Sequence, residues 1–132
     1  KDHVDGITVA KSLGKDLKTV YKTLVTQARS RVYYVFVIPV AENLSLKKAA
    51  RACGEKNLEM IHVRDINKVT GYIRGGCSPI GMKKTYPTYI DQSAKDIETI
   101  TVSAGKVGYQ VELSPDDLIN LIKGQYADLI AD

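Results

Sequence analysis

The sequence has few of the residues that build metal centres. Of its 132 residues, only two are cysteines and two are histidines. Cys53 and Cys77 lie far apart and in no CxxC arrangement, and His3 and His62 are isolated. Structural zinc sites use four such ligands at short characteristic spacings. The sequence therefore predicts no metal site, and it favours reduced thiols in a cytosolic protein.

The chain also lacks a long hydrophobic segment. The apolar stretch "VYYVFVIPV" has nine residues and contains a proline, whereas a membrane-spanning helix needs about 20 apolar residues. We find no signal-peptide pattern, no linker and no internal repeat. These absences predict no membrane partner, a cytoplasmic location and one domain over residues 1–132.

The balance of charge is only mildly basic. Nineteen Lys and Arg face fifteen Asp and Glu, so the formal charge is +4, and the pI is about 9.0. Hydrophobic residues make up 44% and charged residues 26% of the chain, as in ordinary globular proteins. This balance is compatible with a nucleic-acid partner but does not demand one.

Hydrophobic periodicity predicts an α+β fold. A helix near residues 7–13 precedes two strands within 18–27 and 32–40, which pair as a hairpin. Short helices follow within 45–54 and 63–71, and then a glycine-rich loop. Three strands and a final helix complete the chain, within 85–91, 98–105, 108–114 and 114–130. Because strands and helices do not alternate, the sheet should be mixed or largely antiparallel.

The helix-start signals are specific. Ser45 is a plausible N-cap, and Gly54 ends that helix. Ser114 can cap the last helix, and Pro115 suits its first position. Gly124 could divide this last helix in two, and its expected buried face consists of Leu118, Leu121, Ile122, Leu129 and Ile130.

A lysine stands in the first predicted strand. Tyr21, Thr23 and Val25 share one face of that strand, and Lys22 shares the other with Leu24 and Thr26. A lysine on a strand otherwise built for burial is either an edge residue that discourages aggregation or a site residue. The spacing alone favours the edge residue.

The segment "GYIRGGCSPIGMKK" concentrates four glycines between residues 71 and 84. Gly76 and Gly81 have the spacing of a phosphate-binding P-loop, but Met82 stands where that motif needs lysine. The chain beyond is extended rather than helical, which excludes the nucleotide-binding interpretation. A nest of amides for a carbonyl or carboxylate oxygen and a simple tight turn remain equally open.

Three motifs occur in order along the chain: "VYKTLV", "LSLKKAA" and "TGYIRGGCSPIGMKK…PTYID". Together they resemble the YbaK/EbsC family of free-standing aminoacyl-tRNA editing domains, which are related to the editing insertion of prolyl-tRNA synthetase. The resemblance implies a β-barrel-like mixed sheet flanked by helices and deacylation of mischarged tRNA, chiefly Cys-tRNA(Pro). It makes Lys22 the catalytic residue. The substrate-binding loop would consist of Gly75, Gly76, Cys77, Ser78, Pro79 and Gly81.

The same resemblance implies no cofactor and no general base, so that the cysteine thiol of the substrate attacks its own ester. It implies aminoacyl-tRNA and a transient complex with prolyl-tRNA synthetase as partners, and no DNA. Ala-tRNA(Pro) as substrate and a non-catalytic tRNA-binding or regulatory module remain alternatives. The sequence departs from the family in lacking or not showing an N-terminal strand, in Gln110 where aspartate is frequent, and in Cys77 where an aliphatic residue is usual.

Overall fold

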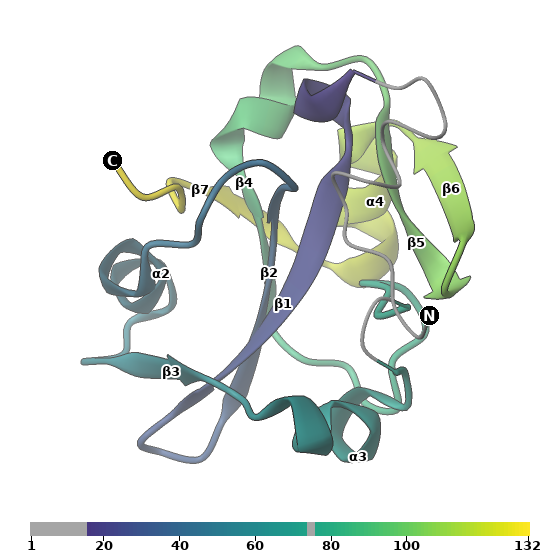
Figure 1. Ribbon diagram of the computed structural model, residues 1–132. Coiled ribbons are helices and arrows are strands. Elements are labelled where there is room, and N and C mark those ends of the chain that lie inside the picture. The colour runs from purple at the N-terminus through teal and green to yellow at the C-terminus, as the bar shows by residue number, and fades with distance from the viewer. Residues whose placement is uncertain (1–15, 74–75) are drawn as a thin grey trace.

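A computed structural model describes residues 16–73 and 76–132 of the protein. Its centre is a five-stranded sheet with the strand order β3-β1-β2-β4-β7 (Figure 1). The strands are β1 (Tyr21–Ala28), β2 (Tyr33–Pro39), β3 (Leu58–Met60), β4 (Thr88–Asp91) and β7 (Gln125–Ala127).

The two longest strands of this sheet form the predicted hairpin. β1 and β2 run antiparallel, with Tyr21 opposite Pro39 at the open end. The chain reverses over residues 29–32, where the amide of Ala28 donates to the carbonyl of Val32 at 2.9 Å. Val, Tyr and Phe dominate both strands, as expected of residues that pack well on a pleated surface.

The pairing is mixed, as predicted. β3 pairs antiparallel with β1, whereas β4 and β7 add parallel strands beyond β2. A second antiparallel hairpin, β5 (Ile100–Lys106) with β6 (Tyr109–Leu113), joins the sheet through a parallel bridge between Val20 and Thr101. Over the described residues the five-stranded sheet has two ends, at β3 and β7. The sheet was expected to be barrel-like, and over these residues it is open rather than closed into a barrel.

Both faces of the sheet are buried. Successive side chains of a strand point to opposite faces, and β2 is apolar at nearly every position, which explains its continuous hydrophobic run. Figure 1 shows α2 on one side of the sheet, and α4 with the β5–β6 hairpin on the other. The core on the α2 side includes Phe36, Ile38, Ala49, Ala50 and Leu129, and the core on the α4 side includes Tyr21, Val37, Ile90, Ile100, Val102 and Leu118.

The predicted caps of the two longer helices are confirmed. In α2 (Leu46–Cys53), Ser45 Oγ accepts from the Lys48 amide at 3.1 Å, and Gly54 ends the helix with φ 76°. In α4 (Pro115–Ile122), the hydroxyl of Ser114 accepts from a first-turn amide. Each cap satisfies a backbone donor that the helix itself cannot.

Shorter helices connect the strands. The chain between β3 and the glycine-rich loop forms a 3-10 turn, η2 (Val63–Asp65), that continues into α3 (Ile66–Thr70). Two further 3-10 turns are η1 (Leu17–Thr19) and η3 (Gln92–Asp96). None of the helices in the described part of the chain has the length and hydropathy that a membrane span requires.

The predicted final helix is wrong beyond residue 122. The chain leaves α4 at Lys123, which has φ 54°, and becomes the strand β7 beside β4. A Cβ on Gly124 would lie 3.1 Å from the carbonyl oxygen of Thr88, so glycine allows this close approach. Leu121, expected in the core, is 60% exposed, because α4 packs through Leu118, Ile119 and Ile122 instead.

The sequence did not predict strand β3, because three residues carry too little alternation to mark a strand. The predicted helix near residues 7–13 lies outside the described residues.

Candidate functional site

The glycine-rich loop connects α3 to β4 and brings most of the predicted site residues together. Gly75 lies outside the described residues. Gly76, Ser78 and Pro79 are buried, Cys77 is partly buried and Gly81 is exposed. The loop packs on the α4 side of the sheet, where Ile80 joins the core around Tyr21 and Val37.

Gly76 lies directly against the turn of the β5–β6 hairpin. A Cβ at this position would be 3.1 Å from the amide nitrogen of Val107 and 3.3 Å from the Cα of Lys106. No flexible side-chain end could move away from it, since the neighbouring atoms belong to the backbone. Glycine is thus required here by close approach of two backbones.

Tyr72 holds the far end of the loop, although the sequence analysis did not select it. Its hydroxyl donates to the carbonyl oxygen of Ile80. A Cβ on Gly81 would lie 3.0 Å from this hydroxyl, and a Cβ on Gly105 in β5 would lie 2.9 Å from the ring. Both glycines have positive φ, 72° and 102°. The tyrosine ring therefore fits closely between the loop and β5, because both neighbouring positions are glycines and have no side chain.

The amides of the loop differ in whether a described residue accepts from them. The Gly76 amide donates to Ile73 O at 3.0 Å, and the Ile80 amide donates to Ser78 Oγ at 3.1 Å. The amides of Cys77 and Ser78 donate to no acceptor among the residues that the structure describes. Neighbouring free amides of this kind suit a carbonyl oxygen that acquires negative charge.

The Cys77 side chain has the environment of a packing residue. It lies against the core cluster of Val25, Val35 and Val69. Burial raises the pKa of the Cys77 thiol to about 11, and a hydrogen bond with Thr70 lowers it by a smaller amount. Because the thiolate is the nucleophilic form, a thiol with this pKa is a poor nucleophile at neutral pH.

Lys22 is partly buried in β1. Burial lowers the pKa of its ammonium, and the charge of Glu42 offsets part of this shift. Lys22 pairs with Ile38, so it belongs to the face of the sheet that carries α2 rather than the face on which the loop packs. Within the described residues it makes no hydrogen bond to the loop.

Among the described residues, the outer edge of β1 has no partner strand beside Lys22. Val20 bridges to Thr101 at one end, and the pairing with β3 begins only at Thr26. In the described part of the chain, no strand covers the edge between these two points. Lys22 and the loop therefore lie on opposite faces of the sheet, and the β1 edge beside Lys22 pairs with no strand of the described residues.

Comparison with known proteins shows to which family the chain belongs. A family described as aminoacyl-tRNA editing domain matches residues 4–121. The chain belongs to the aminoacyl-tRNA editing domain family. A relative from Enterococcus faecalis, named as the Cys-tRNA(Pro)/Cys-tRNA(Cys) deacylase EbsC, is 48% identical over 98% of this chain and 79% of its own length.

Solved structures agree with this editing-domain fold. A crystal structure described as a trans-editing enzyme for prolyl tRNA synthetase superposes with a TM-score of 0.86 at 24% identity, over 96% of this chain and 80% of the other. The hypothetical protein APE2540 gives a TM-score of 0.89 at 20% identity, over 96% and 84% of the two chains. At these identities, the two structures support the fold alone.

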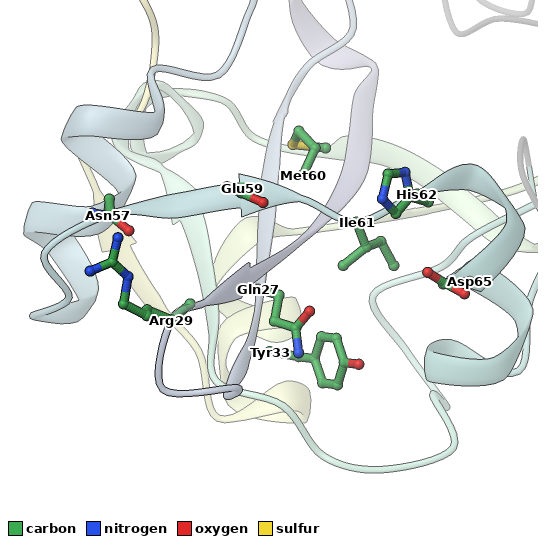
Figure 2. A pocket seen from close by; sticks show the side chains of 10 residues that line it. Gln27, Arg29, Tyr33, Asn57, Glu59, Met60, Ile61, His62 and Asp65 are labelled. Carbon is green, nitrogen blue, oxygen red and sulfur yellow. The ribbon is translucent and has the colours of Figure 1, made fainter.

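A separate cavity lies on another part of the editing domain. It has a volume of about 300 Å³ and opens beside β3, the β1–β2 turn and η2 (Figure 2). His62 and charged groups of both signs line it, including Arg29, Glu59 and Asp65. No predicted site residue belongs to its lining. Among the described residues, no group of three or more His, Cys, Asp or Glu could hold a metal ion.

Lys47, Lys48 and Arg51 form a basic face on α2, and this face is partly engaged within the protein. The ammonium of Lys48 donates to the carbonyl of Ile130 at 2.8 Å and forms ion pairs with Asp128 and Asp132. Lys48 thereby fastens the C-terminal segment to α2. A phosphate contact from this face would have to come from its neighbours Lys47 and Arg51, both exposed.

Gly81→Ala should destabilise the protein more than Gly54→Ala does. Both positions have positive φ, which costs an L-residue about 1–2 kcal/mol. Only Gly81 also faces a close neighbour, the Tyr72 hydroxyl, whereas a Cβ on Gly54 meets nothing within 4 Å. Urea denaturation of both variants measures the difference in free energy of unfolding.

Tyr72→Phe provides the control, since it removes the hydroxyl that the new Cβ would meet. In this background, Gly81→Ala should cost as much as Gly54→Ala. Equal costs of the two alanine substitutions in the wild-type background would contradict the assigned contact.

Proposed function

We propose that this editing domain deacylates mischarged tRNA, chiefly Cys-tRNA(Pro), by cleaving the ester between the amino acid and the terminal ribose. The observation that carries the proposal is the 48% identity, over nearly the whole chain, to a protein named as a Cys-tRNA(Pro)/Cys-tRNA(Cys) deacylase. The amides of Cys77 and Ser78, which have no acceptor among the described residues, support it, because ester cleavage needs donors for a developing oxyanion.

The substrate supplies the nucleophile in this proposal. The thiol sulfur of the esterified cysteine attacks its own carbonyl carbon and forms a sulfur–carbon bond. The ester carbon–oxygen bond then breaks, the thiol proton passes to the departing ribose oxygen, and cysteine thiolactone leaves. The protein needs no nucleophile of its own, which agrees with the protonated, packed state of Cys77.

The protein contributes position and charge. The amides of Cys77 and Ser78 receive the carbonyl oxygen, and the loop holds them in place before the reaction begins. The Lys22 ammonium lies on the opposite face of the sheet, reaches the substrate past the β1 edge that no described strand covers, and stabilises the negative charge that forms on this oxygen. Its partial burial strengthens this attraction, because charges interact more strongly where water is excluded.

A partner would help the editing domain to recognise the tRNA that carries the amino acid. A chain of 132 residues with a formal charge of +4 offers little surface for reading both ends of a tRNA. We therefore propose that the editing domain acts in a transient complex with prolyl-tRNA synthetase, which selects tRNA(Pro).

A panel of aminoacyl-tRNAs tests the proposed function. We expect rapid release of cysteine from Cys-tRNA(Pro), slower release of alanine from Ala-tRNA(Pro) because alanine has no thiol, and no release from Pro-tRNA(Pro). Adding prolyl-tRNA synthetase should increase the preference for tRNA(Pro). Equal rates with cysteine and alanine would contradict the substrate-assisted step. Binding without turnover of any member would instead indicate a regulatory module.

Lys22→Met should lower the rate of Cys-tRNA(Pro) deacylation by about 10²–10³-fold, as loss of one oxyanion donor does elsewhere. Methionine keeps most of the length of the side chain and removes only the charge. The rate is measured in single turnover on Cys-tRNA(Pro). Lys56→Met, at an exposed lysine beside β3, is the matched control and should retain the wild-type rate. A Lys22→Met variant with near-normal activity would remove Lys22 from the mechanism.

Cys77→Val should retain deacylation within a few-fold of the wild type. Valine fills similar space against Val25, Val35 and Val69 and leaves the backbone amides in place. The measurement is the same single-turnover rate, with unfolding by urea to show that the variant is folded. Cys53→Ala, in α2, controls for loss of a thiol elsewhere. A folded but inactive Cys77→Val would show that the thiol takes part in the reaction.

A further inference from the structure

An exposed aromatic residue stands beside the glycine-rich loop. Tyr109, the first residue of β6, is 61% exposed, and the Lys106 ammonium lies 5.4 Å from the centre of its ring. Most other tyrosines in the described residues are buried or partly buried. An exposed ring next to a cation is the combination with which proteins stack a nucleic-acid base and bind its phosphate.

The position of this pair relative to the loop is fixed by backbone contact. Lys106 and Val107 form the turn that touches Gly76, and Lys106 pairs directly with Tyr109 across the hairpin. Figure 1 shows the turn between β5 and β6 next to the segment that follows α3. Tyr109 therefore pairs with Lys106, whose backbone contacts Gly76, and Gly76 directly precedes the amides of Cys77 and Ser78.

The chemistry of the substrate places a base close to the ester. In an aminoacyl-tRNA, the ester oxygen belongs to the ribose of the 3′-terminal adenosine. If the carbonyl lies at the amides of Cys77 and Ser78, the adenine lies only one ribose away. We propose that Tyr109 stacks on this terminal adenine and that Lys106 binds the adjoining phosphate. This assignment rests on the proposed function, since it takes the ester to lie in the loop.

Other exposed apolar residues do not offer the same combination. Leu121 on α4 is equally exposed, at 60%, but is aliphatic and cannot stack a base as an aromatic ring does. Tyr33, which lines the separate cavity, has the ring of Tyr86 packed against it edge-on at 5.7 Å. The β5–β6 turn alone among these places joins an exposed ring and a cation to the candidate site.

Binding of uncharged tRNA tests the assignment without relying on catalysis. The wild type should bind tRNA with a complete 3′ end more tightly than tRNA that lacks the terminal adenosine but keeps the adjoining phosphate as a 3′-phosphate, by roughly 5- to 150-fold, as expected of one stacked base. Tyr109→Ala should bind the two tRNAs equally. Tyr109→Phe and the exposure-matched Leu121→Ala should behave as the wild type.

Lys106→Met should weaken binding of both tRNAs and lower the salt dependence of affinity, because one phosphate contact is lost. Wild-type protein that does not distinguish the two tRNAs, or a Tyr109→Ala variant that still distinguishes them, would overturn the role of Tyr109. Unchanged affinity of Lys106→Met would overturn the role of Lys106.

A kinetic measurement separates this inference from the proposed function. Tyr109→Ala should raise KM for Cys-tRNA(Pro) by a similar factor and leave kcat near the wild-type value. Wild-type turnover with an unaffected Tyr109→Ala variant would defeat the inference alone. Adenosine-dependent binding without turnover of any aminoacyl-tRNA by the wild type would defeat the proposed function and keep the adenosine site.

Discussion

The contact between Gly76 and the β5–β6 turn is the constraint on which the candidate site depends. Two stretches of backbone meet there without a side chain between them, since an added Cβ would lie 3.1 Å from the Val107 nitrogen. The hairpin is itself anchored to β1 by the bridge from Thr101 to Val20. The loop is thus positioned by the sheet through a chain of backbone contacts. This arrangement suits a site that uses backbone amides as hydrogen-bond donors, because the position of an amide is set by the position of its backbone.

The side chains around the loop serve the same purpose. Tyr72 ties the carbonyl of Ile80 to β5, and the Ser78 hydroxyl accepts from the Ile80 amide. Cys77 fills the core on the α4 side of the sheet. These contacts occupy the Tyr72 and Ser78 hydroxyls and the Ile80 backbone, whereas the Cys77 and Ser78 amides have no acceptor among the described residues.

Much of the fold could be predicted because its signals are local. The apolar stretch of β2, the capping Ser45 and Ser114, and the helix-ending Gly54 all depend on neighbouring residues, and each was confirmed. The strand β7 could not be predicted, because Gln125–Ala127 becomes a strand only by pairing with β4, over thirty residues earlier in the chain. The candidate site likewise has a part that the sequence predicts and a part that depends on contacts between distant segments. Glycine spacing and family resemblance selected the loop, but Tyr72 was missed, since its importance arises from a contact with β5.

The β5–β6 hairpin links the two halves of the proposed substrate site. One end of its turn supports the amides that would receive the ester, and Tyr109 on the next strand would receive the adenine joined to that ester through ribose. Because the turn that contacts the loop and Tyr109 belong to one hairpin, the distance between carbonyl and base would be set by one element rather than by a movable domain. In the proposed mechanism, such a site would select for an amino acid attached to a terminal adenosine, a feature that all aminoacyl-tRNAs share. Discrimination among amino acids would then fall to the proposed attack by the substrate thiol, and discrimination among tRNAs to the proposed partner.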